Sequence, residues 1–113
     1  MKKFMVFIYP QGESIFNLSK ENQQKHIQKV GAYLGNLKQD NILLDAQPLQ
    51  PAGTLLIGNK TNLSTDAIGK TDIAGFYMLQ SENKETLINV LKQDPRFEDA
   101  SWKLEIREVL EMM

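Results

Sequence analysis

Apolar and polar residues alternate along the chain in a way that predicts strands separated by helices. Phe4–Tyr9 and Ile73–Ser81 carry apolar residues on both faces of an extended segment, and their aromatic and β-branched residues favour strands. Further strands are predicted at residues 42–49, 54–58 and 101–110. The last of these alternates apolar with charged residues, as a strand with one exposed face does. Residues 11–18 are expected to form a loop, and residues 59–72 a polar stretch with short pairing.

Two other segments repeat apolar residues at the spacing of an α-helix. The first covers residues 20–39 with Ser19 as its N-cap, and the second covers residues 84–93 with Asn83 as its N-cap. The first helix is expected to bury the face formed by Ile27, Val30, Leu34 and Leu37. The second is expected to bury Leu87, Ile88 and Leu91. Asp94-Pro95 ends the second helix, because the residue before a proline avoids helical geometry.

The order of these elements is β-α-β, an additional strand, and β-α-β. This order predicts an α+β fold, the ferredoxin-like split βαβ sandwich, in which an antiparallel sheet carries two helices on one face. In that topology the first strand and the strand before the second helix are central. Both helices are expected to begin at the same end of the sheet.

The second face of the two central strands is also apolar. In the first strand Phe4, Val6 and Ile8 point one way, whereas Met5, Phe7 and Tyr9 point the other way. The later strand repeats this, with Phe76 and Met78 on the side opposite to Ile73, Tyr77 and Leu79. Two helices cover only one face, so we infer that a second copy covers the other, sheet against sheet, in a two-fold homodimer. The alternatives are a monomeric domain with an exposed apolar patch, or a loop that folds over the sheet.

Composition limits the classes of partner. The chain has 113 residues and a mass of 12.9 kDa, the size of one domain covering residues 1–113. Its 13 basic and 14 acidic residues give a formal net charge of −1, so no basic stripe is available and no nucleic-acid partner is expected. Cysteine is absent and His26 is the only histidine, so we expect no disulfide, no thiol nucleophile and no metal.

The N-terminal segment bears on the cellular location of the protein. Met1-Lys2-Lys3 and the apolar residues after it resemble the start of a signal peptide. Pro10 ends this run without a cleavage site of small residues, so the segment is predicted to be a strand and not a signal peptide. The expected cellular location is therefore the cytoplasm. Phe4–Tyr9 is the longest apolar run and is too short to cross a bilayer, so no membrane association is expected.

Several segments together carry a resemblance to a known family. They lie at residues 3–9, 25–37, 47–53, 73–84 and 104–109. In this order and spacing the chain resembles the YCII-related family, also called the DGPF group, over nearly its whole length. The resemblance implies a dimeric α+β barrel, in which two sheets close on each other. It also implies an activity like those of relatives that resemble muconolactone-type isomerases or dehalogenases.

The chain departs from the family at the motif that gives the group its second name. Many members carry Thr-Asp-Gly-Pro-Phe before the central strand. Here Thr65-Asp66 is kept, Ala67-Ile68 replaces Gly-Pro, and Gly69–Asp72 is a shortened remnant of the rest of the family loop. A function tied to that loop is therefore not expected to carry over unchanged.

His26 is the first candidate catalytic residue. It borders the apolar face of the first helix, where an imidazole can take up and release a proton near neutral pH. The resemblance implies an active-site role for a histidine at this position, and it implies that Asp94 supports this histidine. If both helices begin at one end of the sheet, His26 and Asp94 lie apart. The alternatives are a surface histidine and an aspartate that only ends a helix.

Four further residues are candidate ligand-binding residues. Tyr9 ends the first central strand, Tyr33 is a helical neighbour of His26, and Tyr77 lies on the second central strand. Asp66 lies in a segment that could close over a cleft. Packing roles are the alternative for the tyrosines, and a solvated turn is the alternative for Asp66. Trp102 could stack on a flat ligand, although strand aromatics usually pack in a core.

Two main functions remain open at this level, besides a scaffold-like protein that binds no ligand. The first is an enzyme that isomerises, eliminates from or dehalogenates an acidic or lactone-type metabolite with His26 as the proton-transfer group. Such chemistry next to a carbonyl needs acid–base groups alone, so no cofactor is expected. The second is a non-catalytic dimer that binds a small molecule or a protein. Phosphate-binding and nucleophile motifs are absent from the sequence.

Overall fold

An antiparallel sheet of four strands forms one layer of the molecule, with the order β2-β5-β1-β6. The structure is a computed structural model that describes residues 1–11, 18–68 and 72–112. Most of the loop expected at 11–18 and of the remnant at 69–72 lies outside these described residues. The sheet strands are β1 (Lys2–Gln11), β2 (Leu43–Pro48), β5 (Gly75–Ser81) and β6 (Ser101–Glu108). The ferredoxin-like α+β fold and the two predicted central strands, β1 and β5, are confirmed.

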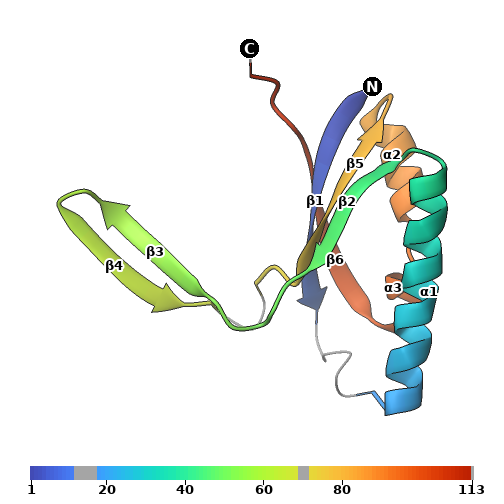
Figure 1. Cartoon of the computed structure of the whole chain (residues 1–113), viewed down its shortest axis with the longest axis horizontal. Helices are drawn as coiled ribbons and strands as arrows, with labels where there is room; N and C mark the ends of the chain where they lie inside the picture. Colours follow the sequence, from blue (N-terminus) through green and yellow to red (C-terminus); the bar gives the residue numbers. More distant parts are fainter. Residues whose placement is uncertain (12–17, 69–71, 113) are drawn as a thin grey trace.

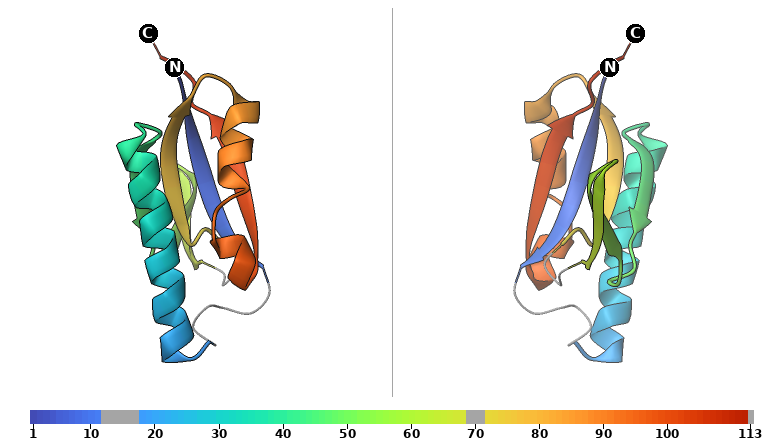
Figure 2. Two further views of the ribbon diagram at one scale, coloured as in Figure 1. Left: turned by 90° about the vertical axis from the view of Figure 1, so that its right-hand side faces the viewer. Right: turned by 90° about the vertical axis from the view of Figure 1, so that its left-hand side faces the viewer.

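Helices cover one face of this sheet (Figures 1 and 2). They are α1 (Lys20–Gln39), α2 (Lys84–Leu91) and the short α3 (Arg96–Asp99). Both predicted N-caps are confirmed, since the Ser19 side chain accepts a hydrogen bond from the backbone of Asn22 and Asn83 accepts one from the backbone of Thr86. The sequence did not predict α3.

The expectation that both helices begin at the same end of the sheet is wrong. β1 and β5 pair antiparallel, and each is followed by a helix that returns along the sheet. The two helices therefore also run in opposite directions, and the turn after α2 leads to α3, which lies beside the first half of α1 (Figures 1 and 2). The start of α1 and the turn after α2 are brought to the same end of the sheet.

The face that α1 buries also differs from the expected one. His26 is only 5% exposed, whereas Ile27 is 66% exposed. Val30 and Leu37 are buried as expected. Helical spacing alone does not decide which of two adjacent residues at the border of an apolar stripe points inward. Here the helix is turned so that the imidazole, and not the isoleucine, lies against the sheet.

The core lies between the helices and the sheet. Its buried members are Phe4, Val6, Ile8, Leu37, Tyr77, Leu79, Leu87 and Leu91. Burial alternates along β5, and the helix-facing residues of β1 are buried while Met5 and Phe7 are half-buried on the other face. Phe7 pairs with Phe76 and Met5 pairs with Met78 in the register of β1 and β5. An apolar strip therefore runs along the middle of the open face.

A hairpin projects from the sheet and pairs with no other strand of the described chain. It consists of β3 (Thr54–Asn59) and β4 (Asn62–Ala67), which lie in a sheet of their own. We call this hairpin the arm (Figure 1). The predicted strand at 54–58 is β3, and β4 is the pairing expected within the polar stretch. The arm exposes Leu55, Leu56, Ile57 and Leu63.

Candidate functional site

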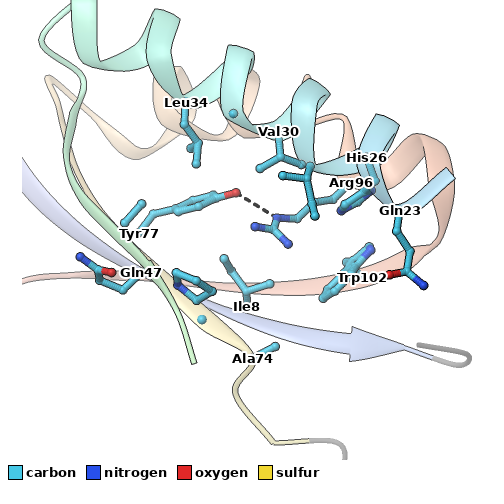
Figure 3. A pocket seen from close by; sticks show the side chains of 15 residues that line it. Ile8, Gln23, His26, Val30, Leu34, Gln47, Ala74, Tyr77, Arg96 and Trp102 are labelled. Carbon is cyan, nitrogen blue, oxygen red and sulfur yellow. Dashed lines mark hydrogen bonds between the residues drawn. The ribbon is translucent and has the colours of Figure 1, made fainter. Parts of the chain in front are cut away.

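A pocket of about 370 Å³ lies between the first half of α1 and the sheet. Side chains from β1, β2, β5, β6, α1 and α3 line it, so residues far apart in the sequence meet there (Figure 3). Its polar lining residues are Gln23, His26, Gln47, Tyr77, Arg96 and Trp102. Ile8, Val30 and Leu34 contribute apolar surface. A mostly apolar pocket with a few polar groups is the usual form of a small-molecule site.

His26 enters this pocket from the second turn of α1. The Ser19 cap fixes where the helix starts, and the turned face of α1 directs the imidazole inward. The side chain lines the pocket together with Arg96 and Val30 (Figure 3). The predicted candidate is therefore a pocket residue and not a surface histidine.

Asp94 is the most deeply buried acidic side chain in the described chain, at 1% exposed. Its Oδ2 accepts a hydrogen bond of 3.0 Å from the Tyr77 hydroxyl. Its Oδ1 accepts one of 3.0 Å from the backbone N–H of Arg96, two residues on. A buried carboxylate is tolerated when it is paired and hydrogen-bonded, and both oxygens of Asp94 meet this condition.

Arg96 joins this carboxylate to the pocket. Its Nε donates a hydrogen bond of 2.9 Å to the Tyr77 hydroxyl oxygen and lies 3.7 Å from Asp94 Oδ2. Its guanidinium carbon lies 5.7 Å from the centre of the Tyr77 ring and 5.2 Å from that of Trp102. Stacking on two aromatic rings holds the planar head at the pocket wall (Figure 3).

The environment of Tyr77 keeps its phenol protonated. Burial raises the pKa of Tyr77 to about 12; the nearby Arg96 cation opposes this rise and the Asp94 carboxylate adds to it. At neutral pH the hydroxyl therefore keeps its proton and donates a hydrogen bond to Asp94. Asp94, Tyr77 and Arg96 form one connected group, which we call the acid–tyrosine–arginine cluster.

Tyr33 lies behind this cluster. Its hydroxyl donates a hydrogen bond of 2.9 Å to the carbonyl oxygen of Val90, which ties α1 to α2. Burial raises the pKa of Tyr33, and the charge of Asp94 raises it further. Tyr33 is thus close enough to Asp94 for the carboxylate charge to affect its pKa, although Tyr33 does not line the pocket.

The structure places the other two candidates elsewhere. Tyr9 lies on the open face of the sheet, where its hydroxyl donates a hydrogen bond of 2.8 Å to Glu105 Oε1 and Lys103 lies over its ring. Asp66 lies on the arm, where its Oδ1 accepts a hydrogen bond from the backbone of Ala67. Of the six candidate residues, the structure therefore brings His26, Tyr77 and Asp94 together.

Comparison with known families identifies the domain. Residues 2–113 match the YCII-related domain. The chain belongs to the YCII-related family. A search of curated proteins gives no match.

A solved structure shares the fold of this YCII-related chain. It is a 5-chloro-2-hydroxyhydroquinone dehydrochlorinase from Burkholderia phenoliruptrix in complex with 2,5-dihydroxybenzoquinone. The two chains are 17% identical with a TM-score of 0.56, and the match covers 91% of this chain and 90% of the other. At this identity the likeness establishes the fold of the YCII-related chain.

Sequence reasoning did not find Arg96. Asp94-Pro95 was interpreted as the end of a helix, with Asp94 as a candidate support of His26. The same residues also begin α3, because a proline is well suited to the first turn and Asp94 accepts a hydrogen bond from the Arg96 backbone N–H. An aspartate followed by a proline is a helix-start signal as well as a stop signal. That signal predicts a turn in which Arg96 returns toward β5.

The described residues give no sign of a metal site or of a membrane span. Within residues 1–11, 18–68 and 72–112, no group of three or more histidine or acidic side chains could hold a metal ion. None of the helices in that part of the chain is long and apolar enough to cross a membrane.

Proposed function

We propose that this YCII-related protein is a cytoplasmic, homodimeric enzyme that moves a proton on a small acidic or lactone-type metabolite. The reaction class is an isomerisation, an elimination or a dehalogenation. The observation that carries the proposal is the buried imidazole of His26 facing a pocket that Tyr77 and Arg96 also line. Function follows from this site and not from the fold, which hosts many activities.

His26 is the proton-transfer group in this proposal. An imidazole changes its charge near neutral pH, so it can remove a proton next to a carbonyl and return it elsewhere. The apolar side chains of Ile8, Val30 and Leu34 keep much of the pocket wall free of competing polar groups. Proton transfer on a carbonyl compound does not require more than such positioned acid–base groups.

Asp94 has a positioning role in this proposal, together with Tyr77. Its two oxygens bind the Tyr77 hydroxyl and the Arg96 backbone, so it fixes both side chains at the pocket wall. Tyr77 contacts the ligand with its ring and lies across the pocket from the helix that carries His26 (Figure 3). The carboxylate thus supports the reaction through its neighbours.

The solved neighbour supports an enzyme over a binding module. Its activity, a dehydrochlorination, is an elimination, and its ligand is a flat ring with ionisable oxygens. A pocket of about 370 Å³ is large enough for one ligand of this size.

The open face of the sheet supports the homodimer. Met5, Phe7, Phe76 and Met78 form its apolar strip, and no described part of the chain covers them. The arm supports the same assembly, because an isolated two-stranded hairpin is only marginally stable in water. Leu56 on the arm is 70% exposed in the single chain. In the dimer, two open sheets pack against each other and form the barrel that one chain does not close.

The proposal is tested with three proteins and a panel of small lactones, dicarboxylates and aromatic acids. Wild type, His26→Gln and the control Gln28→Ala are screened by thermal shift, since a ligand of the folded state raises the midpoint. Gln28 is exposed on the same helix. Each ligand found is then incubated in deuterated buffer and followed by NMR for turnover or deuterium uptake.

We expect the ligand to raise the midpoint of all three proteins. Turnover should persist in Gln28→Ala and fall by about a hundredfold or more in His26→Gln. Turnover that survives in His26→Gln contradicts the assignment of His26. Binding without any turnover in wild type favours the non-catalytic binding module instead.

A further inference from the structure

We propose that the pocket selects carboxylates, and that Arg96 and the indole N–H of Trp102 hold the carboxylate group. The inference deepens the proposed function and rests on its pocket, because it chooses acidic ligands over neutral lactones. It concerns binding alone and involves no chemical step.

The charge of the pocket lining points to an anion. Arg96 is the one lining residue with a permanent charge, and neither aspartate nor glutamate lines the pocket within the described residues. The balancing carboxylate of Asp94 does not line the pocket, and its two oxygens accept hydrogen bonds from the Tyr77 hydroxyl and the Arg96 backbone. A ligand therefore meets the cation of this pair and not the anion.

The hydrogen bonds of Arg96 leave its outer edge for a ligand. Its Nε is used internally, because it donates to the Tyr77 hydroxyl. The two terminal nitrogens of the guanidinium lie toward Ile8 and Trp102 in the close view (Figure 3). A planar guanidinium edge matches the two oxygens of a carboxylate, which makes this pairing stronger than one between neutral groups.

Trp102 supplies an independent observation. Among the buried side-chain nitrogens and oxygens of residues 1–11, 18–68 and 72–112, its Nε1 is the atom without a hydrogen-bond partner. An indole N–H can only donate, so the atom that satisfies it must be an acceptor such as a carboxylate oxygen. Trp102 lines the same pocket and lies under the guanidinium of Arg96.

The remaining wall defines the rest of the ligand. Ile8, Val30, Leu34 and the Tyr77 ring are apolar surfaces. They suit an apolar body of one ring or a short chain attached to the carboxylate. Solvent does not reach Trp102 Nε1, so the side chains at this part of the wall have to move when a ligand oxygen binds there.

The test uses pairs of ligands that differ only in charge. Benzoate is compared with benzamide, and cyclohexanecarboxylate with cyclohexanecarboxamide. Trp102 is the only tryptophan of the chain, so its fluorescence reports binding next to the ring. We expect each carboxylate to change this fluorescence and to bind about tenfold or more tightly than its amide.

Variants assign the preference to the two residues. Arg96→Met should remove the preference for carboxylates, and Arg96→Lys should keep part of it because the charge remains. Trp102→Phe should weaken carboxylate binding several-fold, measured by calorimetry. Lys84→Met, at the exposed start of α2, is the matched control and should bind as wild type does. Circular dichroism verifies that each variant is folded.

The outcomes separate this inference from the proposed function. Amides that bind as tightly as carboxylates, or a preference unchanged in Arg96→Met and Arg96→Lys, overturn the inference. If turnover is found on neutral ligands only, the enzyme stands and the carboxylate site does not. If His26→Gln binds benzoate as wild type does and no substrate turns over, the carboxylate site stands and the enzyme does not.

Discussion

The hydroxyl of Tyr77 links two groups of opposite charge. It donates to the Asp94 carboxylate and accepts from the Arg96 guanidinium, so the proton on this oxygen decides whether the cluster is satisfied. Loss of the proton would place a phenolate directly against a buried carboxylate. The pKa of Tyr77 is raised for this reason, since burial and the Asp94 carboxylate both favour the neutral phenol.

The cluster predicts a stability loss at alkaline pH. The pKa of Tyr77 rises from 10.0 to about 12 on folding, so its stabilisation is complete below the lower value and is lost as the pH approaches the higher one. Two pH units correspond to roughly 2–3 kcal/mol. Urea unfolding of Tyr77→Phe should show a shallower loss across this window than wild type. Gln28→Ala, an exposed position without a titratable group, serves as the control. Parallel curves for wild type and Tyr77→Phe would rule out this role.

A second residue-scale prediction concerns Asp94. Asp94→Ala removes the acceptor of the Tyr77 hydroxyl and of the Arg96 backbone, and leaves the Arg96 charge without its partner. We expect a loss of about 2–4 kcal/mol in the free energy of unfolding. Asp94→Asn keeps acceptor oxygen and shape, so it should lose less. Equal losses in the two variants, measured by urea unfolding, would contradict the hydrogen-bonding role.

Among the helices, α2 shows how a short element depends on its cap. It has only eight residues, and Asn83 accepts the hydrogen bond of the Thr86 backbone at 2.8 Å. We expect Asn83→Ala to lower the free energy of unfolding by about 1 kcal/mol, whereas Asn83→Asp keeps an acceptor and should remain close to wild type. Chemical denaturation of the two variants measures the difference. If alanine and aspartate are equivalent at this position, the cap does not stabilise the helix.

The arm should respond to mutation separately from the body. Gly58 has φ +129°, and a Cβ atom there would collide with the backbone carbonyl of Asn62. We expect Gly58→Ala to disrupt the pairing of β3 with β4 while the four-stranded sheet stays intact. Amide NMR spectra should change in residues 54–67 and not in β1 or β5. Gly35→Ala is the control, because a Cβ there meets no atom within 4 Å.

The helices also show what the sequence could and could not predict. Capping is local chemistry, so Ser19 and Asn83 were identified correctly from residue type. The rotation of α1 was wrong by one residue, because His26 and Ile27 both border the stripe and only the sheet decides between them. The direction of the helices was predicted wrongly because the consequence of antiparallel pairing was not drawn. Since β1 and β5 are antiparallel, the helices that follow them run in opposite directions.

At the scale of the whole molecule, the open face of the sheet carries the prediction of assembly. Phe7 lies opposite Phe76 in the middle of that face, so Phe7→Lys places a charge in the proposed interface. We expect wild type to have twice the 12.9 kDa mass of the chain in solution and Phe7→Lys to approach the single mass. Sedimentation equilibrium measures both. Gln28→Lys, on the exposed side of α1, is the control, and a monomeric wild type would refute the dimer.

The order of elements was sufficient to predict the fold at this scale, but not the site. The alternation of strands and helices has few right-handed solutions, and the central strands followed from it. The pocket, by contrast, depends on α3 returning Arg96 to β5 and on β6 placing Trp102 beside it. Contacts between segments that are distant in the sequence produce no periodic pattern, so they cannot be predicted from it.

The base of the arm is also part of the rim of the pocket. β2 ends at Pro48 and β5 begins at Gly75, both residues line the pocket, and the chain between them forms the arm. If the second subunit of the proposed dimer binds the arm, it therefore also fixes the position of the pocket rim. By thermodynamic linkage, any factor by which a ligand tightens the dimer is the factor by which the dimer tightens the ligand. Subunit concentration would then act as an effector of the pocket.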